Sequence, residues 1–314
     1  MIQRISAVCI VVFSGSFLTA ENVADPFKAA NVDAPGHCPI CVMKTDGSEL
    51  RVVADLGKGK FGGSPQFSGD NKHIAFDVWL KEDSGASQAK VFTVDLATKK
   101  LKELTTGSMP CWVPGEEEEQ HVSFFRHGRD FGLWVVGLDG KGLKRLNRNG
   151  NCPRFSPNGK LYAYNRLGQR GGIVVTNLAD GEHDLVAPNQ DVNGVATYMH
   201  GFAWSPDSKK IVAQVRLPGV DDYEVHLVDT ETREIDRRAI VTAETFSWSP
   251  DGKKILFYMT PKGEKLAQLY TFDVEGDKPP AKVPGQPKNR GNTSGSYSSD
   301  GKWIVFASAL PEDN

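Results

Sequence analysis

Short runs of alternating apolar and polar residues fill this chain, and turn-forming residues interrupt them at regular intervals. One recurrent unit starts with an aromatic residue, continues through Ser, Pro, Asp and Gly, and resumes as an apolar run such as Ile255-Leu256-Phe257. Alternation with a period of two over about four to eight residues predicts half-buried β-strands. In the intervening turn, Ser and Asp bond the local backbone, Pro presets φ and Gly permits a positive φ. The pattern therefore predicts consecutive β-hairpins and an all-β chain.

The hairpin unit recurs six times, and its copies are led by these aromatic residues: Phe67, Trp112, Phe155, Trp204, Trp248 and Tyr297. Successive leading aromatics are 45, 43, 49, 44 and 49 residues apart, which is the length of a four-stranded propeller blade. The repeat predicts a six-bladed β-propeller, with seven blades as the alternative. We expect the leading aromatics to pack as core between neighbouring blades and not to form a ligand platform.

A second strand pair alternates with the first and follows five of the leading aromatics, as in Leu269-Tyr270-Thr271-Phe272. The remaining copy lies before the first aromatic, between Cys41 and Val53. The blades are thus offset from the ends of the chain. We predict that residues 40–55 pair with residues 296–308 and close the ring, which removes two exposed sheet edges.

The aromatic-Ser-Pro-Asp-Gly-Lys turn, best preserved from Trp248 to Lys253, resembles the WD40-like repeat of TolB-type β-propellers over residues 40–308. The resemblance implies the fold much more than a function. It is a resemblance to the family and not to TolB itself, because TolB has an α/β domain ahead of its propeller. In this chain only about sixteen residues precede the first predicted strand after the leader segment described next.

The first twenty residues have the pattern of an export signal. Arg4 precedes an apolar run from Ile5 to Leu18, and Leu18-Thr19-Ala20 offers a cleavage site. We predict a signal peptide at 1–20, a linker at 21–36 and the propeller at 37–314, with a periplasmic or extracellular location and no stable membrane insertion. Because 37 Lys and Arg balance 39 Asp and Glu, we expect no nucleic-acid partner.

Two local features are interpreted as solvent-exposed connections. Residues 116–119 are all Glu and predict a solvated hairpin tip, with cation binding as the alternative. The polar stretch from Lys81 to Lys90 predicts an exposed insert, with a recognition loop over the channel as the alternative.

Four cysteines follow the predicted signal: Cys38, Cys41, Cys111 and Cys152. An even number in an exported protein favours disulfides, and the preferred pairing joins Cys38 to Cys41 and Cys111 to Cys152. The alternative for Cys38-Pro39-Ile40-Cys41 is half of a zinc site or a dithiol switch. We expect no cofactor, with one divalent metal as the alternative.

Residues just before each turn enter on the innermost strand, close to the mouth of the central channel. The candidates for ligand binding there are Ser64, Arg154, His200, Glu244 and Ser294, together with Cys111 and Cys152. They form a polar funnel in one interpretation. In the other, Cys, His and Glu converge on a metal.

Two functions of different kinds follow. The first is a non-catalytic binding scaffold, whose channel mouth and blade loops engage a protein, a peptide or a glycan, with a cell-envelope protein as one such partner. The second is a metal-assisted polysaccharide lyase or hydrolase that uses His200 with Glu244 or the cysteines. We assign no catalytic residue, since no Gly-x-Ser-x-Gly, phosphate-loop or His-Glu-x-x-His motif occurs.

Overall fold

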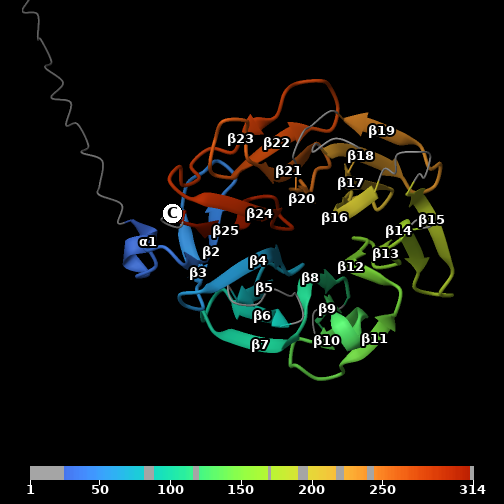
Figure 1. Cartoon of the computed structure of the whole chain (residues 1–314), viewed down its shortest axis with the longest axis horizontal. Helices are drawn as coiled ribbons and strands as arrows, with labels where there is room; N and C mark the ends of the chain where they lie inside the picture. The colour runs from blue at the N-terminus through green and yellow to red at the C-terminus, as the bar shows by residue number, and fades with distance from the viewer. Residues whose placement is uncertain are drawn as a thin grey trace, which may run out of the picture.

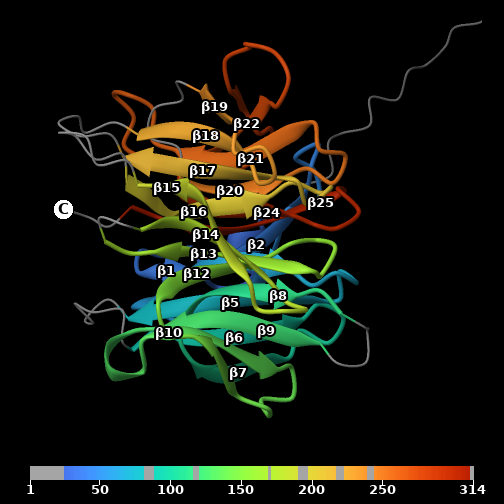
Figure 2. The same cartoon turned by 90° about the vertical axis from the view of Figure 1, so that its right-hand side faces the viewer.

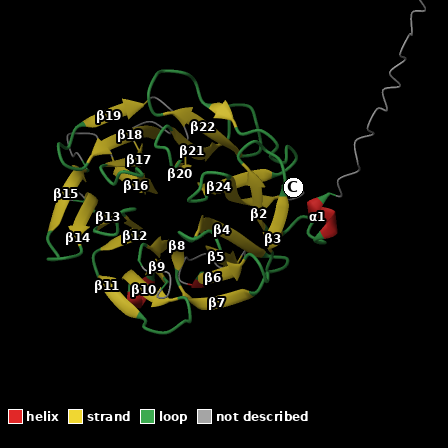
Figure 3. Cartoon of the chain, turned by 180° about the vertical axis from the view of Figure 1, so that it is seen from behind, coloured by secondary structure: helices red, strands yellow, loops and turns green. Residues whose placement is uncertain are grey.

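Six antiparallel sheets form a ring around a central axis in the computed structural model of the chain (Figure 1). The structure describes residues 25–80, 88–115, 120–168, 171–189, 197–216, 223–238 and 244–311. The innermost strands of the six sheets are β4, β8, β12, β16, β20 and β24, and the same order appears when the molecule is viewed from behind (Figure 3). The predicted six-bladed propeller with four-stranded blades is confirmed.

The first three blades each contain four consecutive strands. Blade 1 consists of β4 (Lys60–Phe67), β5 (His73–Leu80), β6 (Lys90–Asp95) and β7 (Leu101–Thr106). Blade 2 consists of β8 (Ser108–Val113), β9 (His121–Arg126), β10 (Gly132–Gly137) and β11 (Lys144–Asn147), with the short 3₁₀ helix η3 (Gly128–Asp130) between its middle strands. Blade 3 consists of β12 (Gly150–Phe155), β13 (Leu161–Arg166), β14 (Gly172–Asn177) and β15 (His183–Pro188).

The other three blades complete the ring. Blade 4 consists of β16 (Thr197–Trp204), β17 (Lys210–Arg216), β18 (Tyr223–Asp229) and β19 (Ile235–Arg238). Blade 5 consists of β20 (Glu244–Trp248), β21 (Lys254–Met259), β22 (Gln268–Asp273) and β23 (Ala281–Lys282). Blade 6 consists of β24 (Gly291–Tyr297), β25 (Trp303–Ala309), β2 (Ile40–Lys44) and β3 (Arg51–Ala54).

Blade 6 joins the two ends of the chain, as the sequence predicted. Strand β2 pairs antiparallel with β25, from Ile40 opposite Ala307 to Lys44 opposite Trp303. The paired residues Val42 and Val305 are buried in one hydrophobic cluster with residues of blade 1, so closure also seals the joint between the last blade and the first. The seam is therefore held by backbone ladder bonds and by apolar burial together.

The segment before β2 packs against this seam. Helix α1 (Pro26–Ala29) lies beside β2 and β3 at the outside of the ring (Figure 3), and Phe27 and Val32 are buried in the cluster of blades 5 and 6. Strand β1 (His37–Cys38) then pairs in parallel with β4, which gives blade 1 a fifth strand that the sequence did not predict.

The blades stack side by side around the ring (Figure 2), and apolar side chains of neighbouring blades pack together. Each hydrophobic cluster joins neighbouring blades; one of them contains Ile173 of blade 3 and Phe202 of blade 4, both almost fully buried. Within the described part of the chain, no helix has the length and apolar character that a membrane crossing requires. Because the hydrophobic clusters hold the blades together, the loops and strand ends are arranged around a packed ring.

Candidate functional site

Five of the six repeat turns share one hydrogen-bonded design that fixes the channel mouth. In blade 5, Ser249 Oγ donates to Asp251 Oδ1 at 2.6 Å and accepts from the backbone N–H of Lys254 at 2.9 Å. The corresponding two bonds are made by the side chains of Ser68, Ser156, Ser205 and Ser298, with Asn158 in place of the Asp in blade 3. The bonds that Asp251 accepts from the Ser249 hydroxyl and from the backbone N–H of Lys253 lower the pKa of its carboxyl, because they favour the ionised form.

Blade 2 lacks this turn. Val113 stands where the other repeats have Ser, and residues 116–119 lie outside the described part of the chain. The predicted roles of the Glu run, and of most of the insert from Lys81 onward, likewise fall on residues that are not described and stay predictions.

Leading tryptophans connect successive blades at the mouth. The indole Nε1 of Trp204 donates to the carbonyl of Arg154 at 2.9 Å, and that of Trp248 donates to the carbonyl of Ala203 at 3.2 Å. Trp112 makes the same bond to Gln66 at 3.0 Å. Each acceptor stands immediately before the leading aromatic of the preceding blade. The buried rings therefore set the position of those residues as well as filling the core.

A cavity of about 460 Å³ opens at this mouth. All six residues that immediately precede a leading aromatic line it: Gln66, Cys111, Arg154, Ala203, Ser247 and Ser296. Arg154 is the one charged residue among the described residues that line the cavity. The leading aromatics Phe67, Phe155, Trp204, Trp248 and Tyr297 and the turn prolines Pro157, Pro206 and Pro250 form its border. Phe155, Trp204 and Trp248 are buried core residues, as expected, whereas Phe67 and Tyr297 are half-buried. All five also border the cavity, which the sequence did not predict.

Most of the predicted channel residues lie deeper, on a bulge that every innermost strand contains. Pairing shifts register between Gly63 and Gln66 in blade 1 and between Thr293 and Ser296 in blade 6, and the other four blades shift at the corresponding place. Ser64, Cys152 and Ser294 occupy these bulges in the left-handed region, with φ of 47°, 55° and 55°. Such bulges redirect side chains and are common beside binding sites.

The structure therefore divides the predicted site residues. Arg154 and Cys111 line the mouth cavity, whereas Ser64 and Ser294 lie half-buried on the bulges behind it. The side chains of His200 and Glu244 lie outside the described part of the structure, so their roles stay predictions. Among the described residues, no three His, Cys, Asp or Glu side chains come together as a metal ion would need.

The cysteine prediction is corrected, because Cys38, Cys41 and Cys111 are free thiols, so neither predicted disulfide is formed. Cys38 lies on β1 opposite Phe61 of blade 1, whereas Cys41 lies on β2 opposite Phe306 of blade 6. The two thus enter different sheets, and Cys38 Sγ donates to the carbonyl of Gly62 at 3.5 Å.

The second predicted pair occupies two different repeat positions. Cys111 lines the mouth, and its Sγ donates to the carbonyl of Trp112. Cys152 lies on a bulge, where its Sγ contacts Met109 Sδ at 2.8 Å. Burial raises the pKa of the Cys38 thiol to about 11 and that of Cys152 to about 12. A reactive thiol needs a lowered pKa, so burial opposes that reactivity at these two positions.

Asp77 is a buried acid between blades 1 and 2 that the sequence did not single out. Its carboxylate is fully buried on β5, and Oδ2 accepts from the backbone N–H of Met109 on the blade 2 bulge at 2.8 Å. Oδ1 has no hydrogen-bond partner among the described residues. Burial raises the pKa of Asp77 to about 6. An apolar strand with one acid gives no sign of such a link, because the partner is a backbone group on another blade.

His226, to which the sequence gave no role, is the middle of a buried relay in blade 4. Its Nδ1 lies 3.1 Å from the Tyr198 hydroxyl, and its Nε2 lies 3.1 Å from Glu224 Oε2. Burial lowers the pKa of His226 and raises that of Tyr198 to about 12. The spacing of Glu224 and His226 on one strand face is the signal that sequence inspection overlooked.

A six-bladed propeller with repeated Ser-Asp turns and an aromatic-bordered channel mouth defines the class of this protein. A family model for the TolB β-propeller domain matches residues 121–312. The chain belongs to the TolB β-propeller domain family. No curated protein matches the sequence.

Solved structures show the same architecture at low sequence identity. The putative TolB from Agrobacterium tumefaciens superimposes with a TM-score of 0.67 at 15% identity, over 88% of this chain and 99% of that one. TolB from Acinetobacter baumannii gives 0.57 at 17% identity, over 87% of this chain and 63% of that one. An oligogalacturonate lyase in complex with manganese gives 0.50 at 16% identity, over 84% and 80%. At these identities the likeness shows the fold alone.

Proposed function

We propose that the chain is an exported binding scaffold that holds an extended segment of a protein partner at the channel mouth. The observation that carries the proposal is the cavity of about 460 Å³, bordered by aromatic and proline side chains from five blades. Aromatic rings supply a large contact area at a small entropic cost, and they are enriched where proteins bind one another. Export rests on the apolar leader segment at residues 5–18.

The positive charge of Arg154 indicates which chemical group the proposed ligand carries. Its guanidinium brings the cavity's one charge among the described lining residues, and the fork of N–H donors matches a carboxylate. Its Nη1 already donates to the carbonyl of Pro153 at 2.9 Å, which helps to hold the side chain in place. We infer that the bound segment carries an acidic side chain or a terminal carboxylate next to apolar residues.

Peptide display against the purified full-length protein tests this function. We expect enriched peptides to combine an acidic residue with aromatic or proline residues. Arg154→Gln should weaken them about 10- to 100-fold, since it removes a charge-assisted hydrogen bond. Arg148→Gln alters an exposed arginine outside the cavity lining and should leave affinity within about twofold.

Two results would contradict the proposal. One is a failure of any peptide to be enriched over a bare support. The other is enriched peptides that bind the Arg154 and Arg148 variants equally well. Thermal melting of both variants controls for a loss of folding.

A further inference from the structure

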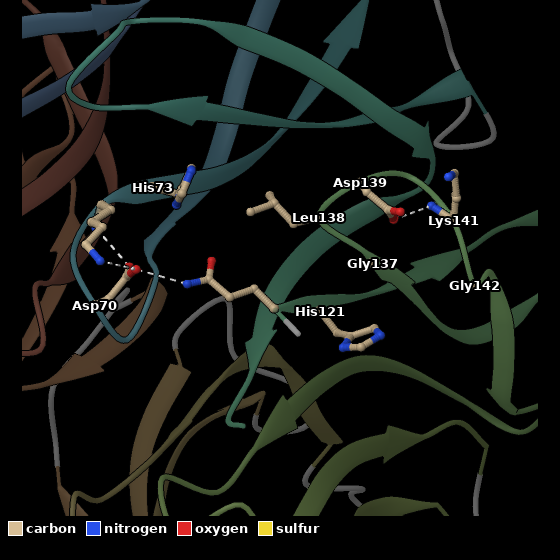
Figure 4. A pocket seen from close by; sticks show the side chains of 10 residues that line it. Asp70, His73, His121, Gly137, Leu138, Asp139, Lys141 and Gly142 are labelled. Carbon is tan, nitrogen blue, oxygen red and sulfur yellow. Dashed lines mark hydrogen bonds and ion pairs between the residues drawn. The ribbon is translucent and has the colours of Figure 1, made fainter. Parts of the chain in front are cut away.

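A second cavity, of about 790 Å³, lies in the groove between blades 1 and 2. Asp70, His73 and Gln120 line one side of it, and Leu138 and Asp139 line the other (Figure 4). It shares no described lining residue with the channel-mouth cavity. Whatever it binds is therefore independent of the proposed peptide site.

Two hydrogen-bond acceptors in this groove have no partner among the described residues. They are Nδ1 of His73 and Oε1 of Gln120, and both atoms are buried. A buried acceptor without a partner has lost its bond to water and has gained nothing in return. Native structures pair most buried polar atoms, so each unpaired one needs an explanation, such as a bound ligand that satisfies it.

Neighbouring carboxylates determine which atoms of His73 and Gln120 remain without a hydrogen-bond partner. Gln120 Nε2 donates to Asp70 Oδ2 at 3.0 Å, so the amide oxygen is not the atom that faces Asp70. His73 Nε2 lies 3.5 Å from Asp95 Oδ2, which favours the tautomer with the proton on Nε2. The groove consequently offers two acceptors and requires a ligand with two donors.

The rest of the lining limits the charge of that ligand. The lining contains two lysines, Lys72 and Lys141, and two aspartates, Asp70 and Asp139, so the charges of these four side chains cancel. The Asp139 carboxylate already accepts from the backbone N–H of Lys141 at 2.8 Å. Leu138 presents an apolar side chain to the same space, as Figure 4 shows. A neutral ligand that has hydroxyl donors and an apolar face fits this lining.

We propose that the groove between blades 1 and 2 binds a sugar residue, with two neighbouring hydroxyls donating to His73 Nδ1 and Gln120 Oε1. Each hydroxyl can also accept, and the C–H face of the ring packs on Leu138. Since both acceptors are shielded from solvent in the free chain, binding includes a side-chain adjustment at His73 and Gln120. The groove is thus a glycan site on the flank of a peptide-binding ring.

Ligand-observed NMR and calorimetry with glucose, N-acetylglucosamine and galacturonate test the site. We expect a neutral sugar to bind and each of His73→Phe and Gln120→Leu to weaken it at least about tenfold. Leu138→Trp, which fills the groove without touching the acceptors, should abolish binding. The matched control is His183→Phe, because His183 lines the corresponding groove between blades 3 and 4 and should have an effect of less than about twofold.

Three outcomes would overturn the sugar site: no neutral sugar binds, His183→Phe weakens binding as much as His73→Phe, or galacturonate binds only through Lys72 and Lys141. Retained melting temperature in each variant shows that a loss of binding is not a loss of folding.

Discussion

At the scale of single residues, the ring depends on buried polar side chains that reach from one blade to the next. Asp77 connects blade 1 to the bulge of blade 2, and Asn165 Nδ2 donates from blade 3 to the carbonyl of Tyr198 in blade 4 at 3.0 Å. Both occupy the same repeat position, ten residues after a leading aromatic. An amide performs this task without charge, whereas a carboxylate must stay buried and ionised at neutral pH.

This contrast predicts that Asp77→Asn stabilises the protein at neutral pH. Burial raises the pKa of Asp77 in the folded protein to about 6, above the ordinary value of 3.8, so the fold favours the neutral acid. The stability of the fold is therefore highest below about pH 4, and this contribution is lost as the pH rises through 6. Above pH 6 the unsubstituted protein therefore has a lower free energy of unfolding, because it buries a charged carboxylate. We expect a gain of about 1 to 3 kcal/mol at pH 7.5 that vanishes below pH 4, measured by urea unfolding across this range.

Asp229→Asn is the control for that measurement. Hydrogen bonds from the backbone N–H groups of Thr232 and Glu231 lower the pKa of the Asp229 carboxyl, so its ionised form stabilises the fold and the change should lower stability at pH 7.5. A gain in both variants, or in neither, would show that burial of charge at Asp77 is not the cause.

At the scale of elements, the repeat turn is the unit that the sequence predicts best. Its aromatic, Ser, Pro and Asp residues are adjacent in the chain, and their bonds are local, so sequence alone reveals the hairpins, their number and the closure by β2. The bulges are different. A register shift on an innermost strand changes which side chain faces the channel, and it depends on pairing with the next strand.

For this reason the predicted site residues divide between two positions on the innermost strands. Arg154 immediately precedes a leading aromatic and lines the mouth, but Ser64 and Ser294, two positions earlier, lie on the bulge. The cysteine pairing was also inferred from positions in the sequence. The short spacing of Cys38 and Cys41 suggested a local bridge, whereas the strands send these two residues into different sheets.

Removal of one turn serine should destabilise the whole ring. In Ser249→Ala, the buried hydroxyl is removed, and the N–H of Lys254 and the carboxylate of Asp251 each lose a part-buried hydrogen bond; we expect a loss of about 1 to 3 kcal/mol in urea unfolding. Ser48 makes the same Ser-to-Asp bond, to Asp46 at 2.6 Å, in an exposed turn. Ser48→Ala should therefore cost less than about half as much. Equal losses would mean that the burial of Ser249 does not increase the contribution of this hydrogen bond to stability.

At the scale of the whole molecule, one buried cation fastens the N-terminal segment to the joint of the ring. The Arg290 guanidinium lies just before β24, is almost fully buried, and stacks over the Phe27 ring at 4.1 Å. Its ion pair within the described chain is with Asp33 at 3.3 Å, and it also donates to Ser308 of β25. Segments from both ends of the chain thus meet on one side chain.

Asp33→Asn should loosen this joint more than a surface change would, because it leaves a buried charge without its carboxylate. Since Asp33 is 30% exposed, we expect a loss of about 1 to 3 kcal/mol, below the usual cost of breaking a fully buried pair. Arg290→Met replaces the cation with an apolar side chain that can pack on Phe27, so the double variant should recover most of that loss. A double-variant cycle by urea unfolding measures the coupling. If the two losses simply add, Arg290 and Asp33 are independent, and the N-terminal segment is held to the ring by the burial of Phe27 and Val32 alone.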